Sequence, residues 1–354
     1  MVLGMLGLVA PGVFDEIGID VSLPMQSVFM QLARYYIRNE PDECILNHVS
    51  AREKLDGLPS WCPNFASPEE TTSLHSLWIY EGIVGSIGEP QKYRAGFLLE
   101  GELQKPTNEK LVWTVIKNAH HRQYPMQNVY NTDNPRQIAL IIDSNNIGAS
   151  GMAIDEVVAI IDCNPGVESA KFFNFNSIQQ SHQWEAACLG LAKRTLIDNS
   201  DIPKVYWRTL IAKFICDTLG DDVIFWDQHD QVNFLDAYQG FKDFLQITAD
   251  LGESISEENL SPWSKLFSAR MRRATRRRRF FATRDGRIGL GPSDTQVGDA
   301  VCVLFFCPTP YILRHGPVGT SQLIGEAYVH GLMYSEALDM LVQGLVDETQ
   351  WVID

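Results

Sequence analysis

The sequence lacks the residue spacings that mark the common catalytic and metal centres. It has no Cys-x-x-Cys pair, and its 7 cysteines and 8 histidines form no HExxH or Cys/His ligand pattern. It also has no phosphate-binding loop, and Gly148-Ala149-Ser150-Gly151 falls short of the GxSxG nucleophile elbow. We therefore expect no metal site and no cofactor, and we expect any activity to survive chelation.

Long apolar runs and positive charge are also scarce. No stretch of about 18 uncharged apolar residues occurs, so we expect no membrane-spanning helix. Lys and Arg number 29 against 44 Asp and Glu, and the net charge of −15 gives a surface that repels nucleic acid and anionic membranes. The cysteines are scattered through a long chain, which is typical of a reducing compartment. We expect a cytoplasmic protein.

What the chain does contain is enough apolar material for a folded core. Its 354 residues are 45% hydrophobic and 10% aromatic, which excludes a disordered or low-complexity protein. At about 100–200 residues per domain, this length predicts two domains or one elaborated domain.

The hydrophobic pattern alternates between helical and strand-rich parts. Helical spacing predicts α-helices at residues 178–196, 205–219, 232–249, 263–274 and 335–345. Period-two patterns and short apolar runs predict strands at residues 78–84, 96–103, 111–116, 138–142, 156–161, 280–283, 287–290, 301–306, 311–313 and 323–329. Turn residues fall at 144–146 and 148, and Asp285-Gly286 is typical of a tight hairpin turn.

These patterns predict an α+β fold with two strand clusters on either side of a helical middle. We infer a small, mostly antiparallel, barrel-like sheet system with preceding and inserted helices. The expected parts are a helical segment at 1–70, a first strand cluster at 71–162, a helical insertion at 163–279, and a second strand cluster with a C-terminal helix at 280–354.

Several short motifs, in this order along the chain, are those of one protein family: Leu3–Leu8, Gly57–Trp61, Trp207–Ile211, Arg279–Thr283 with Gly289–Pro292, Gly298–Leu304, and Leu323–Gly331. On these residues the chain resembles the region that follows the HET domain in fungal heterokaryon-incompatibility-like proteins. The resemblance implies that the cell-death effector, the HET domain, would lie N-terminal to everything matched. We therefore expect this sequence to be without the HET domain and its effector activity.

One stretch departs from the pattern of that family. Residues 72–125 look like additional material between the tryptophan motif and the next matched strand, and they are rich in large aromatic side chains. Aromatic rings can form the wall of an apolar pocket at small entropic cost. The alternative interpretation, an extra hairpin with a core of its own, is equally consistent with the sequence.

Two functions from different classes fit these features. The first is a cofactor-independent pocket enzyme of fungal secondary metabolism, which would cyclise a small hydrophobic polyene or terpenoid by a Diels–Alder or related pericyclic reaction. Such chemistry requires a preorganised apolar cavity and one or two hydrogen-bond donors. The alternative is a non-catalytic recognition or regulatory module of heterokaryon-incompatibility type, and we lean narrowly toward the enzyme.

The enzyme hypothesis assigns roles to individual residues. Hydrogen-bond donors to a substrate carbonyl would be Tyr80, Arg208 and His330. The apolar wall that binds the substrate would consist of Trp78, Tyr93, Phe97 and Trp113.

A basic run at Arg270–Arg279 holds seven arginines and no acidic residue. Such a run can bind phosphate or direct nuclear import. We favour the simpler interpretation, that these arginines pair with the many carboxylates of the chain.

Overall fold

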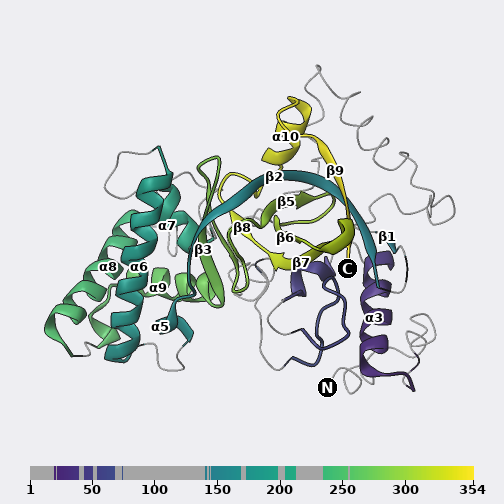
Figure 1. Ribbon diagram of the computed structural model, residues 1–354. Coiled ribbons are helices and arrows are strands. Elements are labelled where there is room, and N and C mark those ends of the chain that lie inside the picture. The colour runs from purple at the N-terminus through teal and green to yellow at the C-terminus, as the bar shows by residue number, and fades with distance from the viewer. Residues whose placement is uncertain are drawn as a thin grey trace, which may run out of the picture.

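The computed structural model describes residues 20, 22–39, 44–50, 54–67, 74, 140–141, 143, 145–168, 173–197, 204–212, 234–253 and 256–354. Within them the protein has an α+β fold in which a helical layer lies beside a curved sheet (Figure 1). The fold class predicted from the sequence is confirmed.

The helices of the described residues are α3 (Met25–Asn39), α5 (Pro165–Glu168), α6 (Phe175–Thr195), α7 (Lys204–Leu210), α8 (Phe234–Leu251), α9 (Pro262–Thr275) and α10 (Glu336–Val342). Short 3₁₀ turns are η1 (Ile45–His48), η5 (Glu257–Asn259) and η6 (Pro317–Gly319). The strands are β1 (Leu140–Ile141), β2 (Ile147–Ile161), β3 (Arg278–Thr283), β4 (Ile288–Pro292), β5 (Ala300–Leu304), β6 (Tyr311–His315), β7 (Ser321–Glu326), β8 (Tyr328–Val329) and β9 (Glu348–Ile353).

Among the described residues, the strands form one nine-stranded sheet with the order β5-β6-β7-β9-β2-β3-β4-β8, and β1 pairs with β2. An additional pairing between β5 and β2 closes β2, β5, β6, β7 and β9 into a ring. Every pairing is antiparallel except the short parallel contact of β7 with β9. The described strands of the two predicted clusters, β1 and β2 of the first and β3–β9 of the second, therefore belong to one barrel-like sheet system.

Strand β2 joins the ring to the rest of the sheet and arches over it in Figure 1. Its first part pairs with β9 and β5, and its last part pairs with β3. Register shifts occur at Ala153/Asp155 and at Val157/Ala159, where the strand passes from one set of partners to the other. Such irregularities bend a strand, and they allow β2 to serve both parts.

Both faces of β5, one of the ring strands, are buried. In β5, Val301 and Val303 belong to one hydrophobic cluster and Cys302 and Leu304 to another, and all four are 0% exposed. The first cluster lies against α10, and the second is covered by α3, η1 and the segment that follows η1. Because residues on both of its faces are buried, the sequence of β5 is a continuous apolar run and not an alternation of apolar and polar residues.

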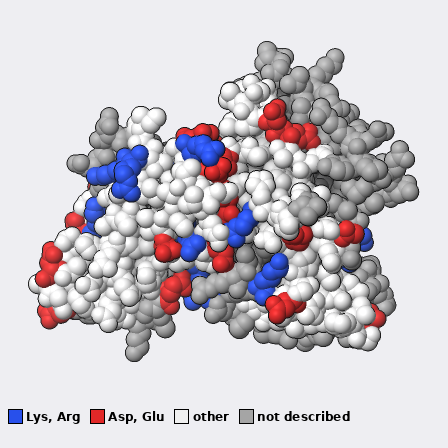
Figure 2. Space-filling view, in the orientation of Figure 1, with Lys and Arg blue, Asp and Glu red and all other residues white. Residues whose placement is uncertain are grey.

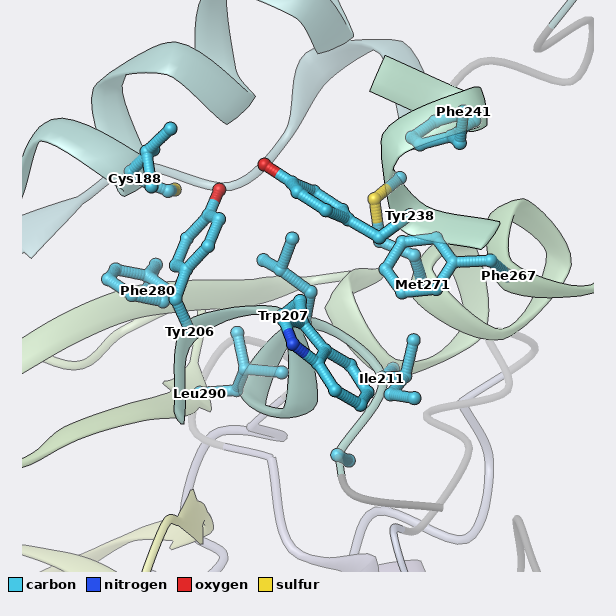
Figure 3. Packing of buried hydrophobic residues seen from close by; sticks show 14 of the residues in the cluster. Cys188, Tyr206, Trp207, Ile211, Tyr238, Phe241, Phe267, Met271, Phe280 and Leu290 are labelled. Carbon is cyan, nitrogen blue, oxygen red and sulfur yellow. The ribbon is translucent and has the colours of Figure 1, made fainter. Parts of the chain in front are cut away.

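The third hydrophobic cluster lies between the helical layer and the outer face of β3, β4 and β8 (Figure 3). Helix α8 contributes Tyr238, Phe241 and Leu245, which recur at helical spacing and are fully buried. Helix α9 begins cleanly because the Ser261 hydroxyl accepts the Ser264 N–H and Pro262 occupies the first turn. The layer is therefore held by amphipathic helices that the sequence pattern predicts.

The segment around Ser60 closes the ring at the place where the ring strands β7 and β9 move apart. Strands β7 and β9 are paired only at Ser321 and Ile353. Beyond that point the Ser60 N–H donates to the Asp354 carbonyl at 2.6 Å, and the Ser60 Oγ accepts the Leu323 N–H at 2.9 Å. Ser60 thus bridges β7 and β9.

Trp61 fixes this bridging segment in place. Its side chain is 0% exposed, and its indole N–H donates to the Asn145 carbonyl at 2.7 Å. The Arg34 guanidinium of α3 lies 5.9 Å from the centre of the ring. The tryptophan motif of the sequence is therefore a structural element of the ring.

Several observed elements differ from the predicted ones: the short helix α5 was not predicted, and the strand predicted at 323–329 is divided into β7 and β8. Strand β2 begins at Ile147 and includes Gly148, where we expected a turn, and β9 was not predicted. Strands predicted at 78–84, 96–103 and 111–116 lie outside the described residues. Helix α7 ends at Leu210, because Ile211 and Ala212 form a turn in which Ala212 has a φ of 50°. The helix predicted at 205–219 is therefore wrong from Ile211 to Ala212, and residues 213–219 lie outside the described part of the chain.

Candidate functional site

Most of the residues assigned to a site from sequence cannot be compared with the structure. Outside the described residues lie Trp78, Tyr80, Tyr93, Phe97 and Trp113. The two others, Arg208 and His330, are described and have defined surroundings.

Arg208 lies in the short helix α7, which packs against β4. The residue is 9% exposed, and its guanidinium carbon lies 5.5 Å from the centre of the Trp207 ring. A guanidinium over an indole ring is a favourable cation–π arrangement. Arg208 is thus a buried side chain with hydrogen-bond donors, and it lies in the helix that packs against β4.

His330 follows β8 and is half-buried. Its Nδ1 lies 3.1 Å from the Tyr328 hydroxyl, and its backbone N–H donates to the Ile288 carbonyl at 3.3 Å. Since the imidazole has a second nitrogen, it could exchange a hydrogen bond with another group while keeping Tyr328 as a partner.

Strand β4 connects the surroundings of the two residues. It contacts α7 on its outer face and pairs with β8 through Gly289 and Leu290. Trp207, Leu290 and Tyr328 belong to the same hydrophobic cluster. Arg208 and His330 therefore lie on neighbouring elements, although they come from the helical and the strand-rich parts of the chain.

A buried ion pair lies beside this region and was not foreseen from the sequence. The Arg278 guanidinium of β3 donates to Glu326 Oε1 of β7 at 3.0 Å, and the two side chains are 8% and 5% exposed. The same carboxylate oxygen accepts the backbone N–H of Leu74. Leu74 is buried in the cluster that also contains Trp207 and Tyr328. We call Leu74, Arg278 and Glu326, with the adjoining parts of α7, β4 and β8, the junction.

The junction shows where the start of residues 72–125 meets the sheet. Leu74 is held there by its backbone hydrogen bond and by burial of its side chain. A charged pair in an apolar setting is stable only when its hydrogen-bonding capacity is largely used. The bond from Leu74 contributes to that requirement for Glu326.

Several arginines of the basic run contact other side chains of the same protein. Ion pairs join Arg277 to Glu168, Arg278 to Glu326 and Arg279 to Asp162. The Arg272 guanidinium lies 5.1 Å from the centre of the Phe173 ring. These contacts support the interpretation that the run pairs with carboxylates of the chain. They join the end of α9 and the start of β3 to other elements, and Figure 2 shows blue and red residues interspersed on the face it displays.

Two further observations concern the described part of the chain alone. None of its helices is both long and apolar enough to cross a membrane. Within the same residues, no group of three or more His, Cys, Asp or Glu side chains is arranged to hold a metal ion.

Comparison with known proteins identifies one region. Residues 232–341 match the family model of the Het-6 beta-barrel domain, a region of heterokaryon-incompatibility-type proteins. The match runs from α8 through β3–β8 to α10, so it includes the helix that supplies much of the layer and most strands of the sheet. The family resemblance drawn from the sequence motifs is confirmed for this region. Neither the curated proteins nor the solved structures include a match to the chain.

Proposed function

We propose that this chain, through the Het-6 barrel domain at residues 232–341, is a recognition or regulatory module related to heterokaryon-incompatibility proteins. The observation that carries the proposal is the packing of the barrel strands. Their side chains fill the clusters on both faces of the sheet, as in small barrels whose interior is a packed core. A barrel of this kind acts as a rigid scaffold whose loops and outer surface are available for binding.

The charged groups of the domain have roles that suit a scaffold. Arg278 and Glu326 neutralise each other in the interior, and Arg314 is paired with Asp299 at 2.8 Å. Each of these two ion pairs joins separate parts of the domain, Arg278 of β3 with Glu326 of β7 and Arg314 of β6 with Asp299 just before β5.

The partner we propose is a heterokaryon-incompatibility-type protein with a basic contact surface. The net charge of −15 favours association with a positively charged protein and disfavours nucleic acid. An interaction of this kind should weaken as salt concentration rises, because screening shortens the range of charge attraction.

The test is a binding measurement with purified, full-length proteins. We expect this chain to bind a heterokaryon-incompatibility-type protein that carries a HET domain, with an affinity that falls between low and high salt. An unrelated protein of similar size and net charge is the control for unspecific attraction. Equal binding of the control, or no complex with any such partner from the same organism, would contradict the proposal.

A second candidate function, the cofactor-independent cyclase, is favoured by the position of Leu74. The start of residues 72–125 meets the sheet close to the elements that carry Arg208 and His330. If the aromatic residues that follow Leu74 cover this region, an apolar wall and two hydrogen-bond donors would share one site. A polyene held there could be folded for ring closure while a donor polarises its carbonyl.

This candidate has its own test. Replacing Trp78 and Trp113 by alanine should reduce turnover of a polyene substrate or change its product, and turnover should persist in EDTA. Trp263→Ala is the matched control for loss of an aromatic side chain, because Trp263 packs against the helical layer. Unchanged turnover in the double variant would exclude the pocket, and turnover by the wild-type chain alone would count against a purely non-catalytic module.

A further inference from the structure

Two cysteine side chains that are far apart in the sequence meet in the hydrophobic cluster between the ring strands and the helices α3 and η1. Cys44, immediately before η1, and Cys307, just after β5, have their Sγ atoms 3.4 Å apart. They are separated by 263 positions in the sequence, and they are 3% and 0% exposed. A disulfide has an S–S length of about 2.05 Å, so the sulfurs need to approach by roughly a further 1.4 Å to bond.

Polar groups surround this pair of thiols. The Tyr311 hydroxyl lies 3.2 Å from Cys44 Sγ and also donates to Asn47 Oδ1. The Thr309 hydroxyl lies 3.3 Å from the same amide oxygen. When the Tyr311 proton turns toward Cys44 Sγ, Asn47 still has Thr309 as a donor. The site can therefore stabilise a negative charge on Cys44 without leaving the amide oxygen unsatisfied.

The two thiols differ in acidity. Burial raises the pKa of Cys44, but hydrogen bonds from Cys307, Tyr311 and the Leu46 N–H outweigh burial and bring that pKa below its ordinary value. Burial and the contact with Cys44 hold the pKa of Cys307 well above the ordinary value. Glu326, across the strand pair from Tyr311, opposes ionisation of Cys44 and does not reverse the order. In a reaction of this pair with an oxidant, Cys44 would therefore be the nucleophile and Cys307 the partner that keeps its proton.

We propose that Cys44 and Cys307 are a site of oxidative modification, at which a hydroperoxide such as hydrogen peroxide converts the two thiols into a reversible intramolecular disulfide. In the first step, with hydrogen peroxide as the oxidant, Cys44 Sγ attacks one peroxide oxygen, the O–O bond breaks, and Cys44 becomes a sulfenic acid while the other oxygen takes up the Cys44 proton and leaves as water. In the second step Cys307 Sγ attacks Cys44 Sγ, the S–O bond breaks, and a second water leaves with the Cys307 proton. The thiols lose two electrons in total and the peroxide gains two.

The bond would act on the segment that closes the ring. Cys44 leads into η1, which packs against β7, and the chain then continues to Ser60, which bridges β7 and β9. A covalent link from Cys44 to the end of β5 would fasten this segment to the sheet. Oxidation should therefore stabilise the folded chain, and reduction should return it to its original stability.

The experiment uses the full, reduced chain treated with hydrogen peroxide, followed by alkylation under denaturing conditions and peptide mass mapping. We expect a linked pair of peptides containing Cys44 and Cys307, lighter by two hydrogen atoms and separated by dithiothreitol. The melting temperature should rise by roughly 3–10 °C on oxidation. Cys302→Ala is the matched control, because Cys302 is buried in the same cluster and the link should form without it.

Cys307→Ala should abolish the link and leave Cys44 as a sulfenic acid that reacts with dimedone. If that variant folds poorly, peptide mapping of the wild-type chain still shows whether Cys44 and Cys307 become linked. The half-buried Cys163 is the internal control, because its oxidation shows that the peroxide has reacted with the protein. The proposal is overturned if Cys163 is oxidised while Cys44 and Cys307 both remain free to be alkylated, or if either one is linked to a different cysteine.

Discussion

The helical layer and the ring are two well-packed regions built from partners at very different separations along the chain. Helix α8 contacts both α6 and α9, and all three helices lie within residues 175–275. In the ring, by contrast, Ser60 binds Leu323 across 263 positions, and β2 pairs with the C-terminal strand β9. The layer is made from neighbours in sequence, whereas the ring combines the segment around Ser60, the central strand β2 and the C-terminal strands.

This difference shows how each region depends on single residues. The layer buries an extended cluster supplied by several amphipathic helices, and the loss of one contact leaves many others. At the opening between β7 and β9, the ring relies on one segment, in which Ser60 and Trp61 supply the hydrogen bonds and the buried surface. We expect substitutions at the closing segment to be the more damaging ones.

The largest effect should come from Trp61→Ala. This change removes a fully buried indole and its hydrogen bond to Asn145, and we expect it to lower the free energy of unfolding by roughly 4 kcal/mol. Urea denaturation followed by circular dichroism measures the loss. Trp263→Ala, at a half-buried position in α9, should cost only about 1–2 kcal/mol. Equal losses would mean that the ring does not depend on its closing segment more than the layer depends on α9.

The junction, where the two regions meet, should be the next most sensitive place. Glu326→Ala leaves the buried Arg278 guanidinium without its carboxylate, at a cost of roughly 3 kcal/mol. Glu156→Ala is the matched control, because the Glu156–Arg284 pair is 39% and 64% exposed and its loss should cost less than about 1 kcal/mol. Similar stability of the two variants in urea denaturation would show that burial of the ion pair has little effect.

The same contrast explains which parts of the fold could be predicted from the sequence. Helices α8 and α9 and the hairpin at Asp285-Gly286 follow from local patterns, since Gly286 has the positive φ of 86° that such a turn requires. Strand β9 owes its conformation to pairing with β2, and its Glu-Thr-Gln start carries little strand signal. Pairing between strands about 200 residues apart in sequence leaves no local pattern from which β9 could be predicted.

Two other differences have a more specific cause. We expected a turn at Gly148, but this residue lies within β2, and another glycine of the same strand allows a close contact with a neighbouring strand. A Cβ at Gly151 would lie 2.1 Å from the Val303 carbonyl oxygen of β5. The Arg278–Glu326 ion pair was also not foreseen. In the sequence Arg278 is part of a basic run and Glu326 is part of a family motif, and neither pattern indicates that the two side chains are in contact. The candidate donors Arg208 and His330 remain predictions, as does the aromatic wall.

A smaller loss is expected inside the helical layer from Tyr238→Phe. Glu185 is 1% exposed, and its Oε1 accepts hydrogen bonds from both Tyr206 and Tyr238. Removing one hydroxyl from this buried group should cost about 2 kcal/mol. In a Glu185→Gln background the same change should cost only about 1 kcal/mol, because a neutral amide oxygen is the weaker acceptor. An equal cost in both backgrounds, measured by urea denaturation, would contradict a charge-assisted contact.

The smallest effect, and the one that depends on pH, should come from Asp143→Ala at the turn between β1 and β2. The Asp143 carboxylate accepts hydrogen bonds from the Asn146 side chain and from the Asn145 and Asn146 N–H groups, and these bonds lower its pKa below 3.8. Because the folded-state pKa is the lower one, the stabilisation is complete above the unfolded-state pKa and is lost as pH falls through the folded-state value. Since the site is exposed, the variant should lose roughly 1 kcal/mol or less at pH 7. Melting temperatures measured at neutral pH and at successively lower pH should converge for the two proteins, whereas the exposed Asp56→Ala control should differ little from the wild type throughout. A gap that persists unchanged in acid would show that the turn is held by something other than the ionised carboxylate.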